Sequence, residues 1–280
     1  MVVPPLIYLS SGALSLVSLR KGAGSGVTVL VGAGVAAVLL AVLLSNSPVP
    51  GIVFTLAVWA PALLVALALR ASASAGIAVT SAVGLGLIVL ITLTLLVGDP
   101  AKTWGEPIGK LLGPMLNNAG IDPGSEEAKA GLERLAALIH GVLAAGFAAG
   151  TLFGVFIGRW MQSLAYNPGG FQEEFHQLRL PRLLALAVIV ALIGDVLLEG
   201  RAGDFSRDLT LILLTGFLFQ GLAVVHGLVR LMNAHIAWLI GLYALMFVIP
   251  HQLSLLLALV GLADVWFDFR ARKGPGAAPS

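Results

Sequence analysis

The 280-residue chain is rich in apolar residues and poor in charge: 58% of its residues are hydrophobic, 11% are charged, and its mean hydropathy is +0.99. A soluble globular domain has about a quarter of its residues charged, so this composition excludes one. The net charge of +2 implies no acidic partner, because Lys and Arg at helix ends are needed for membrane orientation. The absence of cysteine excludes disulfides, thiolate metal sites and thiol catalysis.

Apolar runs that approach or exceed the roughly 20 residues needed to cross a bilayer recur along the chain. They cover residues 22–44, 50–69, 72–97, 135–158, 183–198 and 209–229. We therefore expect an all-α, polytopic transmembrane helical bundle of about 8–9 membrane segments that forms a single integral membrane domain over residues 1–280. The first apolar stretch, residues 6–19, is short for a span, and we expect the natural start of the protein to lie upstream of Met1.

Residues 99–131 form the longest polar region, and we expect an extracytoplasmic loop there. Apolar residues at helical spacing predict a short helix lying in the membrane interface: Ile108, Leu111, Leu112, Met115 and Leu116. Pro107 and Pro114 indicate that this helix is brief or broken. The next helix is expected to begin near residue 126, after Ser125 as N-cap, and to continue into the apolar run.

Four glycines recur at four-residue spacing in that run: Gly146, Gly150, Gly154 and Gly158. Each would cost about 1 kcal/mol relative to alanine in a helix in water. In lipid, small residues at this spacing let two helices approach closely. The glycine ladder is therefore a candidate helix-packing or partner surface, and internal packing is the favoured interpretation. A weaker stripe of the same kind consists of Ala33, Ala37 and Ala41.

A cytoplasmic amphipathic loop is expected at residues 164–182. After the turn signal at residues 167–170, apolar side chains recur at i, i+4 and i+7 and predict a short helix that ends at Pro181: Phe171, Phe175 and Leu178. The charged side chains of the loop are a candidate cytoplasmic interface: Glu173, Glu174, Arg179 and Arg182. Its arginines could bind lipid phosphate or pair with the two glutamates, and ordinary ion pairs are the plainer interpretation.

The end of the chain contains two short apolar segments, residues 235–249 and 253–269, which form either one kinked helix or a hairpin of two crossings. A hairpin places ten Lys and Arg on the side of the 159–182 loop and six on the other, whereas one kinked crossing gives seven and nine. The positive-inside rule favours the hairpin. The 159–182 loop and a flexible tail at residues 271–280 are then cytoplasmic.

Polar side chains within the apolar segments are functional candidates, because burying a charge in a membrane is expensive. The candidate solute site consists of Gln220, His226, Asp264 and His251. For each residue alone, a packed polar contact or an interfacial position is the commoner explanation. No HExxH metal motif, phosphate-binding glycine loop or GxSxG motif is present, so we expect no enzyme activity, no metal and no cofactor.

Three groups of residues resemble the YybS-like family of uncharacterised bacterial multi-pass membrane proteins: residues 166–171 with 173–175 and 178–181, residues 219–226, and residues 264–270. The resemblance covers most of the chain and implies a bacterial cytoplasmic (inner) membrane protein, without implying an activity. More distantly, the family is similar to the substrate-binding S-components of energy-coupling-factor transporters and to the MreD cell-shape proteins, which work with partners. No binding residue carries over from either.

Two functions follow as hypotheses. The first is a small-solute recognition or transport component, supported by Gln220, His226 and Asp264 and by the helix break at Pro250. The second is a non-transporting scaffold that recruits cell-envelope or division machinery, supported by the glycine ladder and the 164–182 loop. The expected partners are the lipid bilayer, a protein partner subunit and a small-molecule solute, with no nucleic acid. No ATP-binding motif is present, so pumping would need another subunit.

Overall fold

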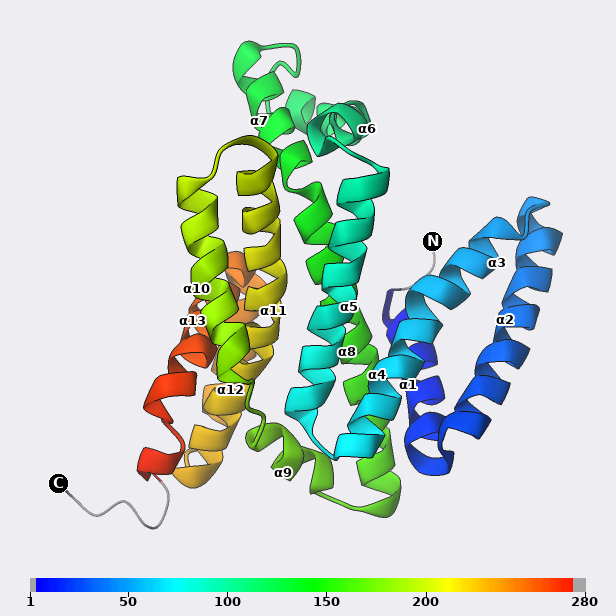
Figure 1. The fold of residues 1–280 in the computed structure, drawn as a ribbon, viewed down its shortest axis with the longest axis vertical. Helices are drawn as coiled ribbons and strands as arrows, with labels where there is room; N and C mark the ends of the chain where they lie inside the picture. The colour runs from blue at the N-terminus through cyan, green and yellow to red at the C-terminus, as the bar shows by residue number, and fades with distance from the viewer. Residues whose placement is uncertain (1–3, 274–280) are drawn as a thin grey trace. The chain divides into compact units, whose positions relative to one another are not determined.

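The computed structural model describes residues 4–273, and the regular structure of these residues is helical, without a strand (Figure 1). Six helical stretches are long and apolar enough to cross a membrane: α2 (Ala23–Ser45), Val49–Ser72, α5 (Ala75–Leu96), α8 (Ile139–Tyr166), α11 (Gly200–Leu231) and α13 (Pro250–Phe267). The stretch Val49–Ser72 combines α3 (Val49–Phe54), a π-helical turn (Thr55–Trp59) and α4 (Ala60–Ser72). The expectation of an all-α membrane protein is confirmed at this level.

Seven shorter or more polar elements complete the described chain: α1 (Pro4–Lys21), α6 (Pro100–Asn118), α7 (Glu126–Ala137), α9 (Gly170–His176), α10 (Arg182–Leu197), α12 (Ala237–Val248) and a 3₁₀ turn (Ala271–Lys273). That turn opens the predicted tail at 271–280, and the rest of the tail lies outside the described residues. The chain forms two compact units. The first unit contains residues 1–83, 148–185 and 214–280, and the second contains residues 84–147 and 186–213. The prediction of one membrane domain over 1–280 stays a prediction.

The two units carry net charges of opposite sign. The first unit holds ten of the Lys and Arg: Arg20, Lys21, Arg70, Arg159, Arg179, Arg182, Arg230, Arg270, Arg272 and Lys273. It holds four acidic residues: Glu173, Glu174, Asp264 and Asp268. The second unit has six basic residues and ten acidic ones. The first unit is therefore cationic and the second anionic.

In the first unit, the glycine ladder of α8 packs against α1. Gly154 faces Ser11, and a β-carbon added at Gly158 would lie 2.5 Å from the carbonyl oxygen of Gly12. Gly150 lies against the ring of Tyr8. Gly146, which belongs to the second unit, has nothing near its added β-carbon. Three of the four ladder glycines thus serve a close helix–helix contact within the chain.

Helices α12 and α13 form a hairpin in the first unit, not one kinked helix. Tyr243 of α12 contacts His226, with 3.2 Å between the hydroxyl oxygen and Nε2, and the side chain of Arg270, after α13, packs on Gly227. Both open ends of the hairpin therefore lie at the C-terminal end of α11. Ile249 breaks the helix with φ −129° and ψ 60°, and Pro250 starts α13. The α11–α13 crossing is close, because Gly221 and Gly261 leave no room for a β-carbon.

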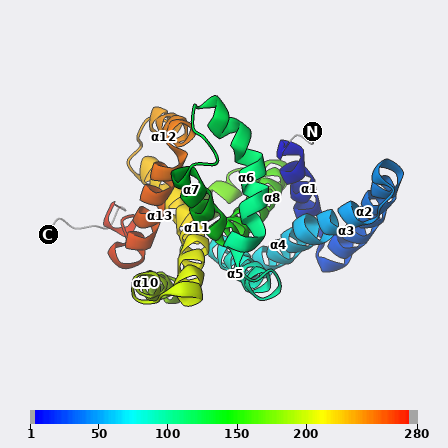
Figure 2. The ribbon, with the colours of Figure 1, turned by 90° about the horizontal axis from the view of Figure 1, so that it is seen from above.

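Helix α2 packs mainly against its neighbours in the chain, α1, α3, the π-helical turn and α4. Figures 1 and 2 show it beside α3 and α4 in both views. Only 6% of its most apolar window is buried, compared with 50% for α8 and for α11. Most of its surface is therefore available to lipid or to another protein.

In the second unit, two boundary predictions are wrong. Helix α6 runs unbroken from Pro100 to Asn118 through Pro107 and Pro114, because Asp99 caps its start by accepting from the amide of Ala101 at 3.0 Å and each proline removes only one backbone donor. The helix that starts at Glu126 ends at Ala137, and α8 begins separately at Ile139. The cap by Ser125 is present, since its hydroxyl accepts from the amide of Ala128 at 3.3 Å.

Candidate functional site

Helix α9 lies at the centre of the cationic end of the first unit. Gly169, in the left-handed region at φ 86°, turns the chain into the helix, and Ser163 accepts from the amide of Phe171 at 3.4 Å. Phe171 and Phe175 then face one cavity, while Glu174 faces others. The predicted amphipathic helix exists, so this part of the loop behaves as its spacing indicated.

The helix ends at His176, five residues before the predicted end at Pro181. The chain leaves the helix so that Leu178 and Leu180, which are 1% and 5% exposed, enter the core. In the extended segment, the amide of Leu180 donates to Oε1 of Gln220 at 2.8 Å. A continued helix would have lost that bond to α11, which explains the early end.

An apolar cavity of about 1000 Å³ opens between α8, α9, α11 and α12. Its wall contains a cluster of aromatic rings centred on Phe156, whose ring centroid lies 5.6 Å from Phe171, 5.9 Å from Phe175 and 5.8 Å from Phe219. Rings at these separations and tilts make favourable edge-to-face contacts. The cavity is large enough for a ligand of drug-like or lipid-like size.

His226 supplies a polar group to this cavity. Its Nδ1 lies 2.8 Å from the carbonyl oxygen of Leu222, which fixes a proton on Nδ1 because a carbonyl only accepts. Its Nε2 lies 3.2 Å from the hydroxyl oxygen of Tyr243. The ring of His176 lies 6.4 Å from that of His226. Two imidazoles and a phenol are thus gathered at one edge of an aromatic wall.

A second cavity of about 1100 Å³ is lined by charged residues, including Arg179, Arg230 and Arg270. It shares His176, Arg230 and Asn233 with the apolar cavity. Burial lowers the pKa of His176, and the charges of His226, Arg230 and Arg270 lower it further. The positive potential that disfavours an imidazolium here favours a bound anion.

Gln220, Asp264 and Arg270 form a buried network beside these cavities. Gln220 donates to Oδ2 of Asp264 at 3.1 Å, and Arg270 reaches the same oxygen at 2.7 Å. The amide of Phe269 donates to Oδ1 of Asp264, and Arg270 also donates to the carbonyl of His176 at 2.6 Å. Both Gln220 and Asp264 are engaged with the protein itself, so they tie α11 and α13 to the segment after α9.

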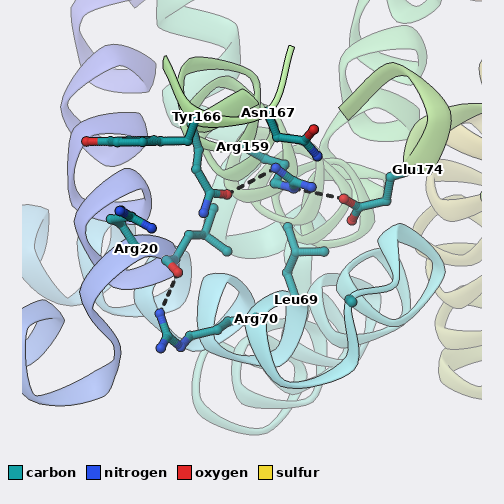
Figure 3. A pocket seen from close by; sticks show the side chains of 10 residues that line it. Arg20, Leu69, Arg70, Arg159, Tyr166, Asn167 and Glu174 are labelled. Carbon is teal, nitrogen blue, oxygen red and sulfur yellow. Dashed lines mark hydrogen bonds and ion pairs between the residues drawn. The ribbon is translucent and has the colours of Figure 1, made fainter. Parts of the chain in front are cut away.

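A smaller pocket of about 350 Å³ lies on another side of α9 (Figure 3). Arg159 donates to Oε2 of Glu174 at 2.8 Å, and Arg70 donates to the carbonyl of Leu19 at 2.5 Å. The guanidinium of Arg20 lies 4.3 Å from the ring centroid of Tyr166. The three arginines of this pocket each have a partner within the chain, and we take the pocket to be a structural joint between α1, α4, α8 and α9.

The predicted cytoplasmic interface has other partners than expected. Glu174 pairs with Arg159, and Glu173 lies 3.8 Å from Arg230. Arg179 makes a two-pronged pair with Asp268 at 2.6 and 2.7 Å. Arg182 is exposed at the start of α10. Ordinary ion pairs are therefore present, but the alternative in which Arg179 and Arg182 pair with the two glutamates is wrong, because the partners come from α8, α11 and the end of α13.

The four predicted solute-site residues lie in three separate places. Gln220 and Asp264 share a hydrogen bond, His226 lines the apolar cavity, and His251 is exposed in the first turn of α13, far along the helix from Asp264. The sequence interpretation missed the aromatic cluster around Phe156. The spacing of His226 and Arg230 at i, i+4 was the available signal for the junction of the two cavities.

No family model matches this chain, and neither a curated protein nor a solved structure shows significant similarity to it.

Proposed function

We propose that this chain is a membrane component that recognises a small amphiphilic anion, with its apolar part in the aromatic cavity and its anionic group at the cationic cavity. The observation that carries the proposal is the junction of the two cavities at His176, Arg230 and Asn233. This deepens the hypothesis of a solute-recognition component. Gln220 and Asp264 serve it as positioning residues and do not bind the ligand.

Arg230 is the residue most suited to meet the anion. Arg270 is 7% exposed and bound to Asp264, and Arg179 is held by both oxygens of Asp268. Arg230, in contrast, is half exposed and lies 3.8 Å from Glu173, which is beyond hydrogen-bond distance. A phosphate or carboxylate can therefore engage Arg230 without breaking a close ion pair.

The distribution of basic residues supports a cytoplasmic location for the end of the first unit that contains the two cavities. Its ten Lys and Arg against six elsewhere predict that this end faces the cytoplasm of a bacterial cell. Adding α1, α10 and α12 to the six long stretches gives nine segments in the bilayer, the upper number of the expected 8–9. Helix α12 reaches only about 18 Å at 1.5 Å per residue, so it inserts as part of a hairpin.

Membership of the YybS-like family and likeness to S-components remain part of this proposal. An S-component-like role requires a second subunit to supply energy, because the chain has no ATP-binding motif. The bilayer, such a partner subunit and the amphiphilic solute are the proposed partners.

Two probes of equal chain length separate anion recognition from nonspecific binding of hydrocarbon. Dodecyl phosphate should raise the unfolding temperature of the purified protein in mild detergent, whereas dodecanol should raise it much less. Arg230→Ala should weaken the affinity for dodecyl phosphate about tenfold or more, as expected for one charge-assisted hydrogen bond. Arg182→Ala is the matched control, because Arg182 is exposed and lines neither cavity.

Equal responses to the two probes, or an unchanged response in Arg230→Ala, would refute the proposal. Phe175→Leu provides a second test. It removes a ring that contacts both Phe156 and His226, so it should weaken the responses to both probes.

The scaffold hypothesis is supported by a different observation, the low burial of α2. A protein partner that depends on this surface should copurify with the wild type and be lost when Ala36, which is exposed on α2, is replaced by a large residue. If such a partner is lost while the dodecyl phosphate response persists, both functions reside in one chain. If the partner is present and no amphiphile binds, the scaffold function replaces our proposal.

A further inference from the structure

The second unit contains a cavity of about 370 Å³ that none of the functions above uses. It is lined by the end of α5, the start of α6, the first turn of α8 and the first turns of α11. Two titratable side chains that face it are almost fully buried, namely His140 at 2% exposure and Asp208 at 4%. A cavity of this size accommodates several water molecules, each of about 30 Å³.

Asp208 has no counter-charge of its own. Its Oδ1 is buried and has no partner in hydrogen-bond geometry, and among residues 4–273 it takes part in no ion pair. The nearest arginine in the chain, Arg207, pairs with Asp204 instead. An ionised carboxylate left unpaired in a buried site is costly. A protonated carboxyl group removes that cost.

His140 is unpaired at the same cavity. Its Nε2 is buried and has no hydrogen-bond partner in the part of the chain that the structure describes. A neutral imidazole can accept a proton at such a nitrogen and release it again. Asp208 and His140 are therefore two proton-binding groups that line one cavity. The amide of Gly141 and the guanidinium of Arg207 interact with the carboxyl group of Asp208, but no ion pair compensates its charge.

Gly141 positions the carboxyl group beside the start of α8. A β-carbon added at Gly141 would lie 2.5 Å from Oδ1 of Asp208 and 2.9 Å from its Cα, so only glycine lets α11 approach so closely here. The glycine next to His140 thus brings Asp208 to the same turn of α8.

The other charges around Asp208 are three acids, two arginines and a lysine. Asp99, Arg201 and Asp204 line the cavity, Arg207 pairs with Asp204, Lys102 pairs with Asp99 at 3.7 Å, and Asp195 of α10 acts on Asp208 electrostatically. The remaining charges, Asp195 and Arg201, balance each other, so the surroundings supply no surplus positive charge to compensate an ionised Asp208. No group of three His, Cys, Asp or Glu that could hold a metal ion occurs in residues 4–273.

From this geometry we infer that the cavity is a proton-binding site in which the carboxyl group of Asp208 holds the proton and His140 exchanges it through the cavity. The inference concerns the second unit alone and is independent of the amphiphile site. In a membrane protein, buried ionisable groups of this kind characterise proton-coupled functions.

Infrared difference spectroscopy of the full-length protein in lipid nanodiscs tests the inference. We expect the carbonyl stretch of a protonated carboxylic acid at neutral pH, and its loss in Asp208→Asn. Asp99→Asn is the matched control, because Asp99 lines the same cavity, pairs with Lys102, and is replaced by a residue that can still cap α6. The band should persist in that variant. No such band at neutral pH, or a band that survives Asp208→Asn, would overturn the inference.

His140→Gln provides a second measurement that does not depend on the stability of Asp208→Asn. Removing the neighbouring titratable group should shift the midpoint of the carboxyl band by about one pH unit, a tenfold change in proton affinity. A midpoint identical to that of the wild type would remove His140 from the site. Loss of the band on addition of sodium ions at constant pH would overturn the inference in favour of a cation site.

Discussion

Two buried carboxylates behave differently in the two units. Asp264 in the first unit and Asp208 in the second are similarly inaccessible, at 3% and 4% exposure. Asp264 accepts from Gln220, Phe269 and Arg270, whereas Oδ1 of Asp208 has no partner in hydrogen-bond geometry. A carboxylate with all its partners ties elements of the fold together, whereas a buried carboxyl group with an unpartnered oxygen is a functional candidate.

The comparison also separates two kinds of polar residue that look alike in a hydropathy profile. Gln220 and Asp264 join α11 to α13 and to the segment after α9, so they build the wall on which the amphiphile site rests. His140 and Asp208 face a cavity. Bonding state, more than burial, therefore distinguishes a structural polar group from a functional candidate.

Breaking the first network should give the largest effect. Asp264→Ala leaves the guanidinium of Arg270 buried without its counter-charge, so we expect a loss of about 3–5 kcal/mol in unfolding free energy. Denaturant titration in detergent measures it. The double variant Asp264→Leu/Arg270→Met should lose less than Asp264→Leu alone. If the double variant lost the sum of both single effects in unfolding free energy, Asp264 and Arg270 would not be energetically coupled.

The glycine crossing beside that network should have the next largest effect. Gly261→Ala places a methyl group against the carbonyl of Phe217, and overpacking of this kind costs about 1–3 kcal/mol. Gly241→Ala in α12 is the control, because its added β-carbon meets nothing within 4 Å. The control should be neutral or stabilising by up to about 1 kcal/mol. Equal unfolding temperatures for the two variants would contradict a close α11–α13 crossing.

Asp208→Asn tests whether the second buried carboxylate contributes to stability as the first one does. It removes no ion pair, so its free energy of unfolding at neutral pH should stay within about 1 kcal/mol of the wild type, whereas Asp264→Asn should lose several times more. Both variants conserve side-chain size, and both are measured by the same denaturant titration. A loss at Asp208 as large as that at Asp264 would show that the second carboxylate is structural as well.

The sequence predicted those features that depend on local pattern. Apolar runs identified the long helices, and the phenylalanine spacing identified α9. Positions that depend on contacts between distant helices were not predictable in this way. Gln220 and Asp264 were recognised as polar, but whether they were free or bonded depends on how α11 and α13 pair.

The residues missed by the sequence interpretation lie at the ends of apolar runs. Asp208 directly precedes the run that starts at residue 209, and His140 lies near the start of the run at 135–158, so both resembled ordinary end residues. Gly141 beside His140 is a local feature that marks close approach of another helix. The partners of Glu173 and Glu174 were wrongly assigned for the same reason, since the nearest arginines in sequence are not the nearest in space.

The smallest effect is expected at the exposed pair of Arg179 and Asp268, which closes the first unit next to the buried network. Hydrogen bonding from Arg179 holds the pKa of Asp268 below its ordinary value. The unfolded chain therefore binds a proton at Asp268 before the folded chain does, and folding becomes less favourable as pH falls. The stabilisation is complete above about pH 4 and disappears as pH falls through the lowered pKa of the folded state.

Because both side chains of this pair are at least one-third exposed, water and salt screen the interaction, and its contribution should be below about 1 kcal/mol. Asp268→Asn should remove that much stability at neutral pH and flatten the fall in unfolding free energy below about pH 4. Added salt should reduce the difference from the wild type. An effect as large as that of Asp264→Ala would mean that the exposed pair, not the buried network, holds the end of α13 in place.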